Sequence, residues 1–194
     1  MHLATRAPSG SNRQPFRFVV LRDGPRARNV RALLAEGAAE VWGQKRARRE
    51  FSDGDPSPAT IRMLASMEQY VATFADAPVI VLPCMLRYRD PTPSEGASVY
   101  PAVQNLLLGA RSVGLGGALT MFHQTRETAI RAALELPDAA FIAGTITLGV
   151  PAGRHGPVRR RPMSQLVFED QWDVSPKWAV DPAGTRFTGG PKNA

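Results

Sequence analysis

At 194 residues, 43% of them hydrophobic and 21% charged, the chain has the size and composition of one soluble globular domain with a buried core. Its single cysteine, Cys84, excludes an intrachain disulfide, and its three histidines show no zinc-ligand spacing, so a metal site is not expected. The net charge of +7 favours anionic partners such as nucleic acid or phosphorylated cofactors.

The first half of the chain predicts one strand and two helices. Residues 16–21 are typical of a strand that ends in a turn at 22–25, and residues 27–44 place apolar side chains at helical spacing. A second helix is predicted to begin with Ser57 as N-cap and Pro58 in its first turn, and to run to about residue 74.

The second half predicts two buried strands and two more helices. Residues 78–82 form a short apolar run, and Pro83 indicates that its ladder stops or lies at an edge there. The polar stretch 87–96 predicts a surface loop of the kind that often flanks an active site. Helices are predicted at 99–113, ended by Gly114, and at 125–136, whereas the apolar run 140–150 predicts a central strand covered on both faces.

The chain shows no internal repeat and no linker, so a single domain over residues 1–194 is expected. Its mixture of helices and strands indicates an α/β or α+β fold in three layers. The tail at about 171–194 has no periodic pattern but carries Trp172 and Trp178, and such a pair, if exposed, usually marks a contact surface.

No segment predicts an association with a membrane. The most continuous apolar stretch, 77–86, is too short to span a bilayer, and residues 1–10 lack the apolar core of a secretory signal. We therefore expect a cytoplasmic protein. Because Cys84 lies inside this apolar run, its thiol is expected to be buried and inert.

Arginine clusters at 46–49 and 159–161 leave alternatives open. The first is interpreted as a solvated helix end near Glu50 and Asp53. The second, taken alone, fits a solvated basic run, a nucleic-acid contact or a phosphate site. A nucleic-acid-binding domain is the less favoured reading, because the chain lacks the interleaved aromatic and basic residues of the usual modules.

Four stretches carry a more specific signal. The first is a loop of turn-forming residues that runs directly into the strand at 16–21, Ala7-Pro8-Ser9-Gly10-Ser11-Asn12-Arg13-Gln14-Pro15-Phe16. The second is Tyr100-Pro101-Ala102-Val103-Gln104-Asn105-Leu106 with Gly114-Leu115-Gly116. The third covers residues 117–122, and the fourth is Leu148-Gly149-Val150-Pro151 with 157–166. The glycines at 114–117 follow a predicted helix instead of a strand, so they do not make a Rossmann fingerprint.

In order and approximate spacing, these stretches resemble the FMN-dependent nitroreductase family over most of residues 7–170. The family's Pro-Ser-x-x-Asn-x-Gln-Pro loop appears as Pro8, Ser9, Asn12, Gln14 and Pro15. The resemblance implies a three-layer α+β fold with a mostly antiparallel central sheet flanked by helices. It also implies a homodimer with FMN at the interface, reduced by NAD(P)H and oxidised by a small-molecule acceptor such as a nitroaromatic or quinone.

The resemblance also assigns cofactor-binding positions. Ser9 and Asn12 would meet the ribityl chain or ring edge, reaching across the dimer, and Pro8 and Gln14 of the same loop are also assigned to cofactor binding. Backbone groups at Leu119 and Thr120 would lie near the reactive face of the flavin, with Gly149 on the closing strand. Arg159 and Arg161 would bind the phosphate. No catalytic residue is assigned, because the hydride chemistry belongs to the flavin.

One departure from the family pattern concerns the N-terminus. The family's Arg-Arg-Ser-x-Arg helix, which binds the FMN phosphate and ribityl chain, is not found before Pro8. We expect a start codon assigned too late, and a variant that binds flavin with fewer cations is the alternative. A flavin-binding storage protein without turnover is the main rival function.

Overall fold

The computed structural model describes residues 1–51, 56–153 and 158–188 of the chain. The chain divides into two compact units, Met1–Pro151 and Ala152–Ala194, and each is described by itself. That both units belong to the single domain expected over 1–194 stays a prediction.

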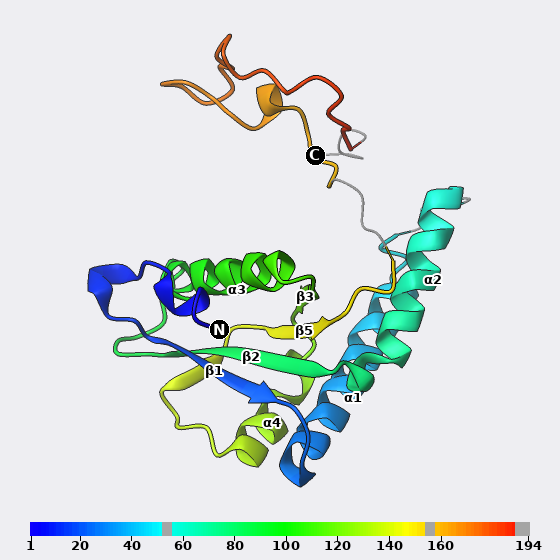
Figure 1. Ribbon diagram of the computed structural model, residues 1–194, viewed down its shortest axis with the longest axis vertical. Coiled ribbons are helices and arrows are strands. Elements are labelled where there is room, and N and C mark those ends of the chain that lie inside the picture. The colour runs from blue at the N-terminus through cyan, green and yellow to red at the C-terminus, as the bar shows by residue number, and fades with distance from the viewer. Residues whose placement is uncertain (52–55, 154–157, 189–194) are drawn as a thin grey trace. The chain divides into compact units, whose positions relative to one another are not determined.

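Five strands of the first unit form one antiparallel sheet (Figure 1). The strand order is β1-β2-β5-β3, and β4 pairs with the far end of β2. The expectation of an antiparallel central sheet is confirmed. The strands are β1 (Phe16–Leu21), β2 (Val79–Leu86), β3 (Gly116–Thr120), β4 (Ala140–Ile142) and β5 (Thr145–Gly149).

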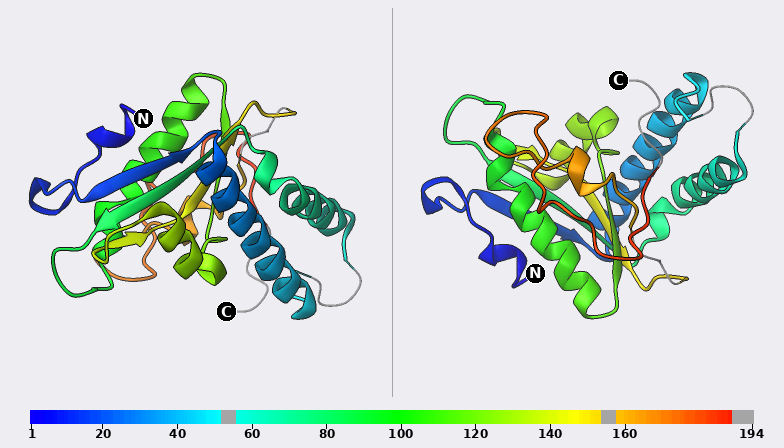
Figure 2. Two further views of the ribbon diagram at one scale, coloured as in Figure 1. Left: turned by 90° about the horizontal axis from the view of Figure 1, so that it is seen from below. Right: turned by 90° about the horizontal axis from the view of Figure 1, so that it is seen from above.

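Helices cover both faces of this sheet, which confirms the three layers (Figure 2). The helix α3 (Tyr100–Ser112) crosses one face, and α1 (Pro25–Ala47) and α4 (Glu127–Leu134) cross the other, with α2 (Pro58–Ala72) beside α1. As predicted, α2 begins at an N-cap, because the Ser57 Oγ accepts a hydrogen bond from the Thr60 N–H at 3.2 Å.

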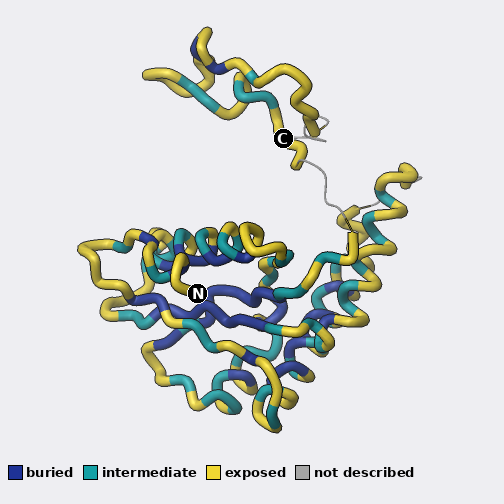
Figure 3. The backbone as a smooth tube through the Cα atoms, in the orientation of Figure 1, coloured by how far each residue is buried: buried dark blue, intermediate teal, exposed yellow. Residues whose placement is uncertain are grey.

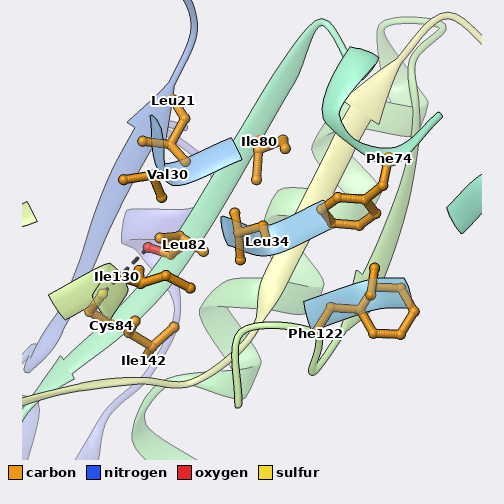
Figure 4. Close-up of a cluster of buried hydrophobic side chains, with 11 residues drawn as sticks. Leu21, Val30, Leu34, Phe74, Ile80, Leu82, Cys84, Phe122, Ile130 and Ile142 are labelled. Atoms are coloured by element: carbon orange, nitrogen blue, oxygen red, sulfur yellow. Dashed lines mark hydrogen bonds between the residues drawn. The ribbon is translucent and has the colours of Figure 1, made fainter. Parts of the chain in front are cut away.

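The strands bury opposite side chains against the two helical layers. On β2, Ile80, Leu82 and Cys84 belong to a core shared with α1 and α4, which includes Leu34 and Ile130 (Figure 4). Val81 points the other way and packs with Val103 and Leu106 of α3. The most deeply buried backbone therefore lies in the central strands (Figure 3). This alternation is the two-residue period of a strand covered on both faces.

The expectation that the ladder stops or lies at an edge at Pro83 is confirmed only for a break on one side: pairing with β5 ends at Val81 and pairing with β4 begins at Cys84, but pairing with β1 continues and Pro83 does not lie at an edge. The strand β2 runs on to Leu86, with β1 on one side and β5 and β4 on the other. The Leu86 N–H donates to Pro15 O on the β1 side, and successive backbone N–H groups of a strand point alternately to its two neighbours. The side on which Pro83 lacks an N–H is therefore the side of β4 and β5. There the partner backbone bulges, so no ladder donor is needed.

That bulge also corrects the prediction of a continuous strand over 140–150. Val81 is opposite Ile146 and Cys84 is opposite Ile142, so three steps along β2 match four along its partner. The extra residue separates β4 from β5, and the Ala143 N–H donates to Pro83 O at 2.8 Å. The run is nevertheless central, because β5 lies between β2 and β3 as expected.

The described residues of the second unit are mostly irregular. They contain a short 3₁₀ turn at Met163–Gln165 and a parallel bridge between Arg160 and Phe187. Trp172 is 84% exposed and Trp178 is 63% exposed, which agrees with side chains available for contact. Among the described helices of the whole chain, none is long and apolar enough to cross a membrane.

Candidate functional site

The loop Pro8–Gln14 is fixed at two points before it enters β1. The Ser9 Oγ accepts a hydrogen bond from the Gln14 N–H at 2.9 Å, which closes the loop on itself. The Gly10 N–H donates to the Ser98 Oγ at 3.2 Å, just before α3 begins. Behind the loop, Pro15 and Phe16 are buried, so the exposed polar segment stands on a rigid base.

The same loop holds an unusual backbone. Three residues without glycine's freedom have left-handed φ angles, namely 51° at Ser11, 52° at Asn12 and 49° at Gln14. Such conformations cost free energy and persist only where surrounding contacts impose them, and they concentrate at ligand-binding sites. The Gln14 Nε2 donates to the Asn12 Oδ1 at 3.1 Å and fixes both amide side chains. The loop therefore presents ordered polar groups to solvent.

A pocket of about 380 Å³ opens beside this loop. The loop forms one wall, and the segment expected to flank an active site, 87–96, forms the other together with the residues that follow it. The lining residues are Pro8, Ser9, Gly10, Tyr88, Arg89, Ser94, Ala97 and Ser98. None of these residues is acidic.

Two guanidinium groups lie over the ring of Tyr88, and of the two arginines only Arg89 lines the pocket. The Arg13 guanidinium carbon is 4.5 Å from the ring centroid, and that of Arg89 is 5.4 Å from it. Arg87, by contrast, forms a two-point ion pair with Glu95, with N–O distances of 3.0 and 2.6 Å. Hydrogen bonding to Arg87 lowers the pKa of the Glu95 carboxyl, so that acid is ionised and already paired.

Leu119 and Thr120 lie on β3, at the opposite edge of the sheet from β1. Because no strand flanks the outer side of β3 in the described residues, alternate N–H and C=O groups there face away from the sheet. Leu119 is 39% exposed, and the Thr120 Oγ1 donates to Thr145 O at 3.3 Å. Gly149 ends β5 opposite Gly116.

Within one chain the structure does not bring these two parts together. The loop precedes β1, and β2 and β5 lie between β1 and β3. Three strand spacings correspond to about 14 Å across the sheet. Ser9 and Asn12 therefore lie on one side of the first unit, and Leu119 and Thr120 on the other.

Arg159 and Arg161 belong to the second unit, in a described extended stretch. Both are exposed. The intervening Arg160 is held in place, because its carbonyl accepts from the Thr188 N–H at 2.9 Å and its Nη1 donates to Arg159 O at 2.8 Å. Alternation along extended backbone therefore turns Arg159 and Arg161 to one side and Arg160 to the other.

The buried titratable groups of the first unit are poorly placed for chemistry with a ligand. His123 is 2% exposed, its Nδ1 lies 3.3 Å from the Thr145 Oγ1, and burial lowers its pKa. Burial raises the pKa of the Cys84 thiol to about 11, so the expected inert thiol is confirmed as buried and protonated at neutral pH. No group of three or more metal-ligating side chains occurs among the described residues.

Comparison with known proteins decides the family. The model of the Nitroreductase family matches residues 1–150, which include the loop, the sheet and all four helices. The chain belongs to the nitroreductase family. The resemblance noted in the sequence is therefore confirmed, and the loop at Pro8–Gln14 lies inside the matched region.

Solved structures of this nitroreductase's relatives share its fold. A nitroreductase from Desulfovibrio desulfuricans, solved with FMN, is 26% identical with a TM-score of 0.61, covering 88% of this chain and 81% of the other. The FMN- and NADPH-dependent nitroreductase NfnB of Sphingopyxis is 19% identical with a TM-score of 0.64, covering 88% and 86%. A Parabacteroides distasonis NADH dehydrogenase or nitroreductase is 21% identical with a TM-score of 0.62, covering 88% and 82%.

The sequence did not single out Arg13, Tyr88, Arg89 and Ser98 as site residues. Arg13 and Tyr88 are far apart in the chain, so only the fold brings the guanidinium onto the ring. A signal was present in the Arg87-Tyr88-Arg89 run of the predicted loop, because alternating arginine and tyrosine is typical of guanidinium stacking.

Proposed function

We propose that this nitroreductase is an FMN-dependent oxidoreductase that takes hydride from NAD(P)H and transfers it to a nitroaromatic, a quinone or a similar acceptor. The observation that carries the proposal is the strained and doubly anchored loop Pro8–Gln14, whose residues resemble the family's flavin loop and which lies within the region that the family model matches. The FMN bound by the Desulfovibrio protein and the NADPH used by NfnB support the same choice of cofactor and reductant.

The residues present fit the polar edge and chain of FMN. A ring edge and a polyol need fixed donors and acceptors that do not have to reorganise on binding. Ser9, Asn12 and Gln14 provide these on backbone held by its own hydrogen bonds, with Pro8 at the entrance of the loop. The free edge of β3 at Leu119 and Thr120 offers backbone N–H and C=O groups, with Gly149 on the adjoining strand.

Arg159 and Arg161 are proposed to bind the FMN phosphate. Each guanidinium offers a planar fork that matches a phosphate, and each is exposed in extended backbone. Arg160 is proposed to hold this segment in place and not to bind the phosphate, because its carbonyl and its side chain already form hydrogen bonds within the segment.

When bound, FMN supplies the hydride-accepting and hydride-donating chemistry of the reaction. The protein's part is to orient the ring, to bond its edge and to exclude water. No side chain of the chain is assigned a proton transfer. We place this reaction in the cytoplasm.

We further propose that the working form is a homodimer. In one chain the Pro8–Gln14 loop leads into β1 at one edge of the sheet and β3 forms the opposite edge, with β1 and β3 about 14 Å apart. A second copy can bring its loop to the β3 edge of the first, so that each flavin meets both chains. Sedimentation at micromolar concentration tests this, and a monomer that still binds FMN would contradict the shared site.

The proposed function is tested by spectroscopy on the purified protein. We expect a yellow protein that releases FMN on denaturation, whose flavin absorbance bleaches with NADPH or NADH under anaerobic conditions and returns on adding a nitroaromatic or quinone. A protein that binds FMN but is not reduced would support a storage role. A colourless protein that takes up no added FMN would contradict flavin binding altogether.

A further inference from the structure

The pocket beside the flavin loop has one guanidinium group in its lining, that of Arg89, and this group forms no ion pair with a described residue. Arg13 and Arg89 both lie over Tyr88, and neither forms an ion pair with any described residue. The nearby Glu95 carboxylate is paired with Arg87, whose hydrogen bonds lower its pKa, and the more distant charge of Arg89 adds to that lowering. Asp90 follows Arg89 in the chain but is not within ion-pair distance of it. The Arg89 guanidinium therefore remains for a ligand at the pocket, and the Arg13 guanidinium lies next to it over the Tyr88 ring.

The hydroxyl groups of the pocket are also arranged as donors. The Ser9 Oγ accepts from the Gln14 N–H, and the Ser98 Oγ accepts from the Gly10 N–H. Each hydroxyl thus uses a lone pair on the backbone, and its own hydrogen is left for another acceptor, since the described residues provide none. Guanidinium and hydroxyl donors without an acidic lining residue are complementary to an anion.

The aromatic ring adds a second feature. Tyr88 is half exposed and forms part of the pocket wall, and its ring is covered by Arg13 from the loop and by Arg89, the next residue in its own segment. A flat ligand with an anionic group can contact the exposed part of the Tyr88 side chain while its charge meets the guanidinium of Arg89. The volume of about 380 Å³ is enough for a small aromatic acid or for one end of a nucleotide.

We propose that this pocket binds the anionic group, a carboxylate or a phosphate, of the small molecule that exchanges electrons with the enzyme. The proposal rests on the proposed function, because the pocket shares Pro8, Ser9 and Gly10 with the flavin loop. Its ligand is an aromatic carboxylate acceptor if the anion is a carboxylate. It is NADPH in preference to NADH if the anion is a phosphate.

The test compares matched anionic and neutral ligands in the Arg13→Gln/Arg89→Gln double variant. Calorimetric titration with benzoate and with its neutral analogue benzamide measures binding without turnover. The KM values for NADPH and NADH supply the phosphate arm. Arg62→Gln is the control, because Arg62 is exposed on α2 and makes no ion pair with a described residue.

We expect the double variant to weaken the anionic member of one pair about tenfold or more, since each lost charge-assisted hydrogen bond has an effect of that size. The neutral member should change less than twofold, and Arg62→Gln should change neither. Selective loss of benzoate identifies a carboxylate, and selective loss of NADPH identifies a phosphate.

Three results would overturn the proposal. They are unchanged binding of both anionic ligands, equal weakening of the anionic and neutral ligands, and a fall in FMN content, which would mean that the arginines hold the cofactor. If the wild type binds no FMN, the proposed function fails, and the benzoate titration still decides whether the pocket binds anions.

Discussion

Replacing Ser9 with alanine tests whether the loop is held in advance for its ligand. The Ser9 Oγ accepts from the Gln14 N–H at 2.9 Å and so closes the loop Ser9–Gln14, which contains three left-handed residues. Removing the hydroxyl leaves the Gln14 N–H, which is exposed, to be satisfied by water. The loop then gains conformations that cannot bind a ligand in the same way.

The size of the effect follows from one neutral hydrogen bond. Its net contribution is about 0.5–1.5 kcal/mol, which corresponds to roughly a two- to tenfold loss of FMN affinity if the bond only preorganises the loop. Backbone strain moves the expected loss of affinity toward tenfold, because each left-handed residue raises the free energy of the loop by about 1–3 kcal/mol and can relax when the closing hydrogen bond is lost. Global stability should change little, because the loop is largely exposed.

Titration of flavin-free protein with FMN, followed by flavin fluorescence, measures the change. Ser9→Thr should restore affinity, because it keeps the hydroxyl and Ser9 has extended backbone angles, φ −148° and ψ 155°, that suit a β-branched residue. Ser112→Ala is the matched control, since its hydroxyl donates to Gly109 O at 2.9 Å far along α3. Wild-type affinity in Ser9→Ala, or an equal loss in Ser112→Ala, would refute the reasoning.

Three further predictions address the phosphate, the core and pH. Arg161→Ala, alone or with Arg159→Ala, should weaken FMN roughly tenfold or more while sparing riboflavin, which lacks the phosphate; equal losses in a titration of both flavins would assign these arginines to the fold. Gly37→Ala should lower the free energy of unfolding, measured in urea, by about 2 kcal/mol or more, because the new methyl would overlap the Phe122 carbonyl oxygen. The control Gly43→Ala, in open space on the same helix, should instead raise the free energy of unfolding by up to about 1 kcal/mol. Similar effects of the two substitutions would disprove this packing. Burial lowers the pKa of His123 below its unfolded value, so the unfolded chain binds a proton more readily than the folded chain. The stabilising contribution should therefore be complete above about pH 6.5 and should fall as the pH drops toward the folded pKa. His123→Gln should reduce this loss of stability between pH 8 and pH 5 in urea unfolding, and an unchanged loss would show that His123 does not cause it.

The sequence predicted those parts of the fold that follow from local periodicity. The helices predicted from the apolar spacing in 27–44 and 99–113 are confirmed as α1 and α3, and the Ser57-Pro58 pair begins α2 as expected. These signals depend only on neighbours three or four residues apart. Strand continuity is different, because it depends on which partner each backbone group faces.

Pro83 shows this difference. The sequence says that a donor is missing but not toward which neighbour, and the missing donor faces a bulge that Ala143 and Gly144 create. Gly144 was the available clue to the bulge, and a side chain there would approach the Leu119 Cδ1 to 2.6 Å, so that Leu119 would have to move. A glycine inside an apolar run often marks such a break.

The candidate site likewise has features that the sequence predicted and features that arise only from the fold. Turn-forming residues predicted the loop, and four ordered motifs indicated its family, but glutamine has no intrinsic preference for the left-handed backbone of Gln14. Tertiary contacts impose that conformation. Pro15 and Phe16 are buried and Pro15 O accepts from Leu86, so the exit of the loop is fixed, while Ser98 fixes its other side at the approach to α3. Because both supports lie distant in sequence, the local pattern can predict a flavin loop, whereas the strain that orders it and the arginine-lined pocket beside it arise only from the fold.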